Sequence, residues 1–180
     1  PTASAFIQQR DKILPLAFEF LLHEFTRSLS GMKTYNGFRL LAVDGTDLHI
    51  ATNPSDPDTY AQNHPEKRGF NLLHLNALYD LYNDVYLDAL VQGRRTENEH
   101  LALVRMVDRC RIPGRAILIA DRGYEGYNNL AHIERKGWKY LIHIKEKSGI
   151  LSGLNLPEPA EFDLDIRRIL TRRQSKDIRA

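Results

Sequence analysis

Two aspartates follow short apolar runs that have the composition of buried β-strands. Asp44 comes directly after residues 40–43, and Asp121 comes directly after residues 116–120. Short apolar runs bounded by glycine or proline are typical of strands buried in a parallel sheet. In open α/β sheets, ligands bind at the carboxyl ends of such strands. We therefore predict that Asp44 and Asp121 lie together where two neighbouring strands end.

A pair of carboxylates in this position is suited to binding Mg²⁺, with Mn²⁺ as a substitute. Mg²⁺ prefers oxygen ligands and needs few protein carboxylates when a phosphate supplies the others. Two ions about 3.5–4 Å apart can activate a water or hydroxyl and stabilise the leaving oxygen of a phosphodiester. Such a site normally has one more carboxylate. The alternative is an ordinary ion pair, for which Arg39 and Arg122 are the candidate partners.

A third aspartate, Asp47, lies close to the first in the sequence. Because side chains alternate between the two faces of a strand, Asp44 shares a face with Leu40 and Ala42, whereas Asp47 points to the other face. We predict that Asp44 is the metal ligand and rank Asp47 below it.

Composition places broad limits on the class of protein. The 180 residues, 42% of them hydrophobic, are enough for about one domain. A formal net charge of +2 neither requires nor excludes a nucleic-acid partner. The only cysteine is Cys110, which excludes a disulfide framework and a cysteine zinc site and fits a reducing cytosol. No apolar stretch approaches the roughly 20 residues that span a bilayer, and a first residue other than methionine, Pro1, indicates an excised fragment.

Residues 1–31 are predicted to form two helices that pack into the core. Thr2 or Ser4 can cap the first helix, and Pro15 can open the second. Apolar residues at helical spacing and a terminating Gly31 complete the second helix. The apolar positions are Phe18, Leu21, Leu22, Phe25 and Leu29.

The rest of the pattern predicts a mixed α/β sheet. After the strand before Asp44 and a polar loop at residues 52–67, residues 70–79 and 85–92 indicate two strands that continue an antiparallel meander. A helix from Thr96 to Cys110 follows, with Thr96 and Glu99 in a capping-box pattern. Strand 116–120, helix 127–135 and strand 139–145 then alternate, as in a parallel sheet. We interpret His74, Asp80, Asp84 and Asp88 as ordinary polar residues of this sheet and its turns.

Three short segments together resemble DDE transposases of the insertion-sequence-4 family. They are residues 41–46 (Leu-Ala-Val-Asp-Gly-Thr), residues 75–80 (Leu-Asn-Ala-Leu-Tyr-Asp) and residues 119–124 (Ile-Ala-Asp-Arg-Gly-Tyr). Residues 4–12 also resemble the segment ahead of that family's catalytic domain, so the likeness covers nearly all of residues 1–150.

The resemblance implies a ribonuclease H-like fold in which Asp44 and Asp121 are the first two metal-binding acids. It implies Mg²⁺-dependent cleavage of double-stranded DNA at transposon ends, followed by attack of the freed 3′ hydroxyl on target DNA. It further implies a bacterial protein of the cytoplasm, associated with the nucleoid, and a homodimer assembled on DNA.

The family's third acid lies in a Tyr-x-x-Arg-x-x-x-Glu pattern, which is absent here. The simplest explanation is that the acid lies beyond Ala180, with residues 148–180 as the start of an insertion after a catalytic core at residues 32–147. Glu99 or Glu97 could instead complete the site, as in ribonuclease H, although the capping role available to Glu99 weighs against it. The remaining alternatives are a nuclease that only hydrolyses and a remnant that binds DNA without cutting it.

The last residues carry a cluster of basic side chains among acidic ones. Such a cluster can follow a phosphate backbone or form a solvated tail, and both interpretations have equal weight. The basic residues are Arg167, Arg168, Arg172, Arg173, Lys176 and Arg179.

Overall fold

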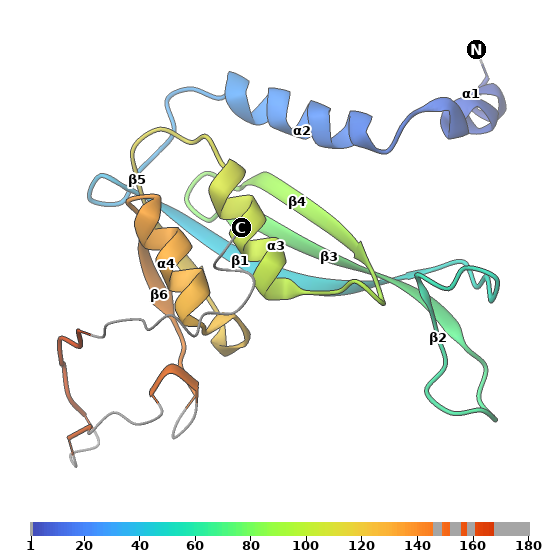
Figure 1. The fold of residues 1–180 in the computed structure, drawn as a ribbon. Coiled ribbons are helices and arrows are strands. Elements are labelled where there is room, and N and C mark those ends of the chain that lie inside the picture. The colour runs from blue at the N-terminus through green and yellow to red at the C-terminus, as the bar shows by residue number, and fades with distance from the viewer. Residues whose placement is uncertain (1, 146–148, 152–155, 158–160, 168–180) are drawn as a thin grey trace.

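A mixed β-sheet with two helices on one face forms the centre of the fold (Figure 1). The computed structural model describes residues 2–145, 149–151, 156–157 and 161–167. The basic cluster is therefore described only at Arg167, and residues 168–180 lie outside the described part. The elements are α1 (Ala3–Gln9), η1 (Arg10–Lys12), α2 (Leu16–Ser28), β1 (Phe38–Ile50), β2 (Tyr60–Ala61), β3 (Phe70–Asp80), β4 (Val85–Gly93), α3 (Glu99–Arg109), β5 (Arg115–Ala120), η2 (Arg122–Tyr124), α4 (Tyr127–Arg135), β6 (Lys139–Ile142) and η3 (Gly149–Leu151).

The strand order of the described sheet is β2-β3-β1-β5-β6, with β4 also paired to β3. Strands β1, β3 and β4 are antiparallel neighbours, which confirms the predicted meander. Strand β5 runs parallel to β1 and β6 runs parallel to β5. The predicted mixed sheet is thus confirmed, including the crossover helices α3 and α4.

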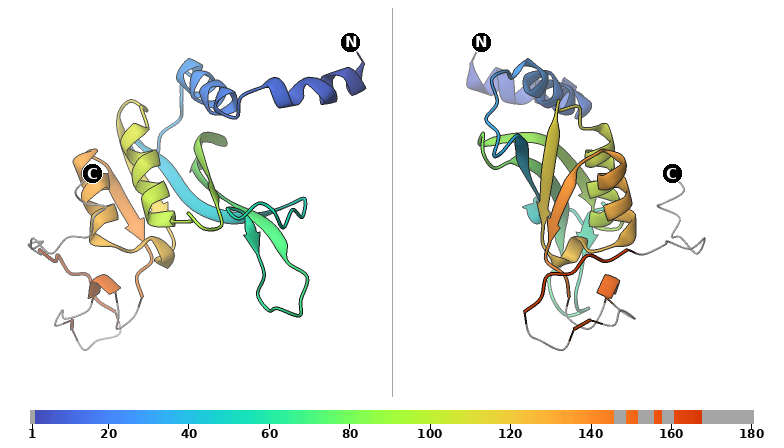
Figure 2. Two further views of the ribbon diagram at one scale, coloured as in Figure 1. Left: turned by 45° about the vertical axis from the view of Figure 1, so that its right-hand side comes forward. Right: turned by 90° about the vertical axis from the view of Figure 1, so that its left-hand side faces the viewer.

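Helices α3 and α4 lie on the same side of the sheet, as the right-hand view of Figure 2 shows. The core between them consists of side chains from alternate strand positions, among them Leu41 of β1 and Leu118 of β5, and of Leu103 and Ile133 from the helices, all completely buried. Burial therefore alternates along β1 and β5 in the two-residue period of a strand. The prediction that these strands are buried is therefore only half right, because only one face of each is fully buried.

The structure differs from the sequence prediction in the length of β1 and in the loop at residues 52–67. Strand β1 continues to Ile50 because it stays paired with β3 over its full second half, so Asp44 lies within the strand rather than after it. The polar loop at residues 52–67 contains the short strand β2. Asp121, by contrast, directly follows the end of β5, as predicted.

The N-terminal helices do not pack into the core, so that prediction is wrong. Thr2 caps α1 as expected, but α2 has no buried residue, and Leu14 and Phe18 are 72% and 63% exposed. Helix α2 instead lies beside β4 (Figure 1) through polar contacts. Glu19 binds Arg109 of α3 at 2.5 Å, and His23 contacts Asp88 at 3.0 Å. The apolar spacing correctly indicated a helix but did not show which face would meet the sheet. None of the described helices is long and apolar enough to cross a membrane.

A buried ion pair fixes the turn between β3 and β4. Asp80 is completely buried and accepts a hydrogen bond from Nε of Arg39, which is itself 5% exposed. Its other carboxylate oxygen accepts the backbone N–H groups of Tyr82 and Asn83, at 3.0 and 3.1 Å. Arg39 therefore pairs with Asp80 and does not form the ion pair with Asp44 or Asp121 that the sequence analysis considered.

Replacing Asp80 by alanine should destabilise the fold by about 3–5 kcal/mol, because it leaves the Arg39 charge buried without its partner. Urea unfolding followed by circular dichroism measures this. Glu66→Ala, at an exposed loop position, is the control and should leave the unfolding midpoint unchanged. Equal midpoints for the two variants would contradict the importance of the ion pair.

Candidate metal centre

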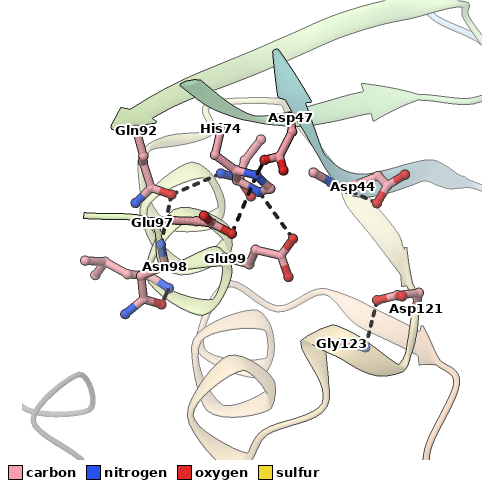
Figure 3. A network of polar contacts seen from close by, with 12 residues as sticks. Asp44, Asp47, His74, Gln92, Glu97, Asn98, Glu99, Asp121 and Gly123 are labelled. Carbon is pink, nitrogen blue, oxygen red and sulfur yellow. Dashed lines mark hydrogen bonds and ion pairs between the residues drawn. The ribbon is translucent and has the colours of Figure 1, made fainter. Parts of the chain in front are cut away.

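The parallel pairing of β1 with β5 brings the two predicted aspartates to the same level of the sheet. The last paired residues are Ala42 and Ile119. Two residues beyond that pair, the same register would set Asp44 level with Asp121, and paired neighbouring strands are about 4.8 Å apart. On its other side Asp44 is held opposite Ala77 of β3. Asp44 is thus fixed in a strand at the point where the pairing with β5 ends (Figure 3).

Both aspartates are exposed, and neither forms an ion pair within the described part of the chain. One carboxylate oxygen of each accepts a local backbone hydrogen bond. Asp44 Oδ1 accepts from the N–H of Gly45 at 2.8 Å, and Asp121 Oδ1 accepts from the N–H of Gly123 at 2.8 Å, which caps η2. The second oxygen of each carboxylate remains available to a cation.

Glu99 does not have the capping role predicted for it. The N-cap of α3 is Asn98, whose Oδ1 accepts the N–H of Leu101 at 2.9 Å. Thr96 lies in the preceding turn, and its hydroxyl donates to the carbonyl of Gly93. The capping box is therefore wrong because the helix begins later than predicted. The reason for giving Glu99 little weight as an acid of the site is removed.

The pKa of the buried Tyr124 phenol is affected by three carboxylates. Tyr124 is 1% exposed, and within the described residues its hydroxyl has no hydrogen-bond partner. Burial raises its pKa most. The negative charges of Glu99, Asp44 and Asp121 raise the pKa further, with Glu99 contributing the most of the three. Glu99 therefore lies within electrostatic reach of the same region as the two aspartates.

His74 is the residue of this region that the sequence interpretation missed. It lies directly opposite Asp47 in the antiparallel pairing of β1 and β3, on the face covered by α3. Its Nδ1 is 2.8 Å from Asp47 Oδ1, and its Nε2 is 3.2 Å from Glu99 Oε1 (Figure 3). This contact confirms that Asp47 lies on the opposite face of β1 from Asp44. The missing signal was the strand register, because aligning β1 with β3 in the correct register sets His74 opposite Asp47.

The acidic surroundings of His74 outweigh its burial. Burial alone lowers the pKa of its imidazole, but the hydrogen bond with Asp47 and the charges of Glu97 and Glu99 raise it, and the net pKa is above the ordinary value. His74 therefore holds a proton more readily than a free imidazole.

Gly45 allows these side chains to reach β1. A Cβ atom at this position would lie 2.5 Å from His74 Nε2 and 2.8 Å from Glu99 Oε1. Position 45 must therefore be glycine to leave space against β1 for the His74 imidazole and the Glu99 carboxylate.

Gly45→Ala should cost about 1–3 kcal/mol of folding stability, because the new methyl group overpacks this contact. Urea unfolding of a double-mutant cycle with His74→Ala tests the cause. In the His74→Ala background most of the cost should disappear. An undiminished cost would show that His74 is not what the methyl group displaces.

Comparison with known proteins identifies the family. Residues 35–179 match the family described as Transposase DDE domain. Because the match covers most of the chain, the chain belongs to this family, and the observed strand order confirms the ribonuclease H-like fold. Searches of curated proteins and of solved structures gave no match. Membership implies an enzyme of the polynucleotidyl transferase or nuclease class that acts on DNA with divalent metal ions.

Proposed function

We propose that this chain is the catalytic domain of a transposase that cleaves the ends of an insertion sequence and joins them to target DNA. The observation that supports the proposal is the parallel register of β1 and β5, which, extended by two residues, would bring the exposed carboxylates of Asp44 and Asp121 to the same level. They are the proposed ligands of Mg²⁺, or of Mn²⁺ in its place.

The donor set fits a hard divalent cation. Both ligands are carboxylates, and within the described residues each retains an oxygen without a hydrogen bond. Both are exposed, so water and phosphate oxygens, which Mg²⁺ requires, can reach them. A bound ion would activate the attacking water or hydroxyl and stabilise the leaving oxygen of the phosphodiester. Strand pairing orients Asp44, and the hydrogen bond from Gly123 orients Asp121, so little reorganisation is needed for binding.

The third carboxylate has two candidates. Glu99 is supported by its freedom from capping and by its influence on Tyr124. The other candidate is the glutamate of the family's Tyr-x-x-Arg-x-x-x-Glu pattern, supplied beyond Ala180 after an insertion that starts near residue 148. In that arrangement residues 32–147 are the catalytic core and residues 1–31 lead into it.

The finer classification is also part of the proposal. The motifs at residues 41–46 and 119–124 support the insertion-sequence-4 family. We propose that the partners are double-stranded transposon ends and target DNA, bound by a homodimer that assembles on the DNA in the bacterial cytoplasm, at the nucleoid.

Asp44→Asn and Asp121→Asn should each lower DNA cleavage by about 1000-fold or more, because an amide cannot replace the carboxylate charge that holds the metal. The substrate is a plasmid that carries both flanks of the protein's own coding sequence, incubated with the native protein and Mg²⁺. Asp84→Asn is the matched control, since Asp84 lies in the β3–β4 turn, remote from the pair, with a backbone φ of 53° that asparagine accepts. Folding and DNA binding should be unchanged in all three variants.

The products distinguish the proposed function from its rivals. Joined donor and target DNA supports strand transfer, whereas nicked DNA alone indicates a hydrolytic nuclease. DNA binding without any cleavage by the native protein would indicate a non-catalytic remnant. Full cleavage by Asp121→Asn would exclude this aspartate as a metal ligand.

Glu99→Gln separates the two candidates for the third carboxylate. If Glu99 holds the metal, the variant should lose cleavage as severely as Asp44→Asn while its thermal unfolding changes little. Cleavage at the native rate would assign the third carboxylate to another residue.

A further inference from the structure

We propose that Asp47, His74 and Glu97 form a second divalent metal site, specific for a transition-metal ion such as Zn²⁺ and separate from the Asp44 and Asp121 pair. These three residues come from β1, β3 and the connection between β4 and α3. The site does not depend on the proposed function.

The ligand atoms lie close enough to share one ion. One donor atom from each of the three side chains lies within 4.8 Å of the others. His74 Nδ1 is 2.8 Å from Asp47 Oδ1 and 3.8 Å from Glu97 Oε1. Bonds from Zn²⁺ to nitrogen or oxygen are about 2.0–2.2 Å, so ligands of one ion lie up to about 4 Å apart. Only small side-chain movements are needed to admit the ion.

The second ring nitrogen of His74 supplies an independent indication. The side chain is 7% exposed, and Nε2 makes no hydrogen bond of acceptable alignment within the described residues, although Glu99 Oε1 is 3.2 Å away. A metal-binding histidine commonly directs its other N–H at a carboxylate, which fixes the ring and its tautomer. Glu99 occupies that position for Nε2, whereas Nδ1–H now donates to Asp47 Oδ1, so a bound ion would replace the Nδ1 proton and leave the remaining proton on Nε2.

The charges and the exposure of the ligands favour a cation. Glu97 uses Oε2 to bind Arg94, which leaves Oε1 directed at His74. The Asp47 side chain is 47% exposed, so the ion has a route from solvent and space for water ligands. An imidazole among the ligands favours zinc, copper, iron or nickel over Mg²⁺, which prefers oxygen alone.

An ion at this position would join three parts of the fold. It would tie β1 to β3 and to the start of α3, three residues along β1 from Asp44 and on the opposite face. We therefore assign it a structural role, in which it stabilises the strand that carries Asp44.

Zinc titration of the chelator-treated protein tests the site. Calorimetry measures the affinity, and NMR of the histidine side chains shows which imidazole is bound. His74→Gln and Asp47→Asn should each weaken the binding of this zinc ion by about 100-fold or more, since even outer partners of metal ligands contribute about 10–100-fold. His49→Gln is the matched control, because His49 is an exposed histidine of the same strand. This control and Asp44→Asn should both retain the zinc-induced shift of the His74 signals.

The test measures zinc binding alone, so its outcome does not depend on whether the protein cleaves DNA. The absence of zinc binding in the unmodified protein would overturn the proposal and leave His74 as an imidazolium between carboxylates. Binding that survives Asp47→Asn, or that is lost in Asp44→Asn and retained in His74→Gln, would also overturn it. Asp47 is half-exposed, so its variant keeps the test valid if His74→Gln misfolds, which circular dichroism would reveal.

Discussion

The parallel pairing of β1 with β5 is the constraint on which the rest of the structure depends. It joins the antiparallel meander to the parallel part of the sheet, and it places the core residues Leu41 and Leu118 beneath the same two helices. The pairing ends at Ala42 and Ile119, whereas β1 continues along β3. Asp44 and Asp121 follow two residues beyond these paired positions, and both are exposed. The pairing therefore brings both aspartates toward the same level of the sheet, and its end leaves them exposed.

The alternation of side chains along β1 divides the acidic residues between two environments. Asp44 lies on one face of β1, whereas Asp47 lies on the other face against His74. Gly45 connects the two environments, because its missing side chain admits Glu99 and His74 against the strand. Glu99 contacts His74, and together with Asp44 and Asp121 it raises the pKa of Tyr124. The membership of the transposase DDE domain family gives the first group its proposed role, and the second group follows from geometry alone.

Local patterns were sufficient where neighbouring residues decide the structure. The apolar runs indicated the order of strands and helices, and the alternation of strands with helices indicated the mixed sheet. The patterns failed where distant partners decide the structure. The stripe of Phe18 and Leu21 indicated a core helix, yet polar contacts with β4 and α3 hold α2 with these residues exposed. Thr96 and Glu99 matched a capping box, yet Asn98 caps the helix.

The sequence by itself determined that Asp121 follows a strand, that Asp44 and Asp47 face opposite ways, and that the chain combines a meander with parallel strands. These features follow from apolar periodicity and from the two-residue repeat of a strand. Only the tertiary structure decided that Arg39 pairs with Asp80, that His74 meets Asp47, and that Glu99 reaches the same region. These contacts depend on the register between strands and on where α3 begins. Residues far apart in the sequence set both, so no local pattern contains them.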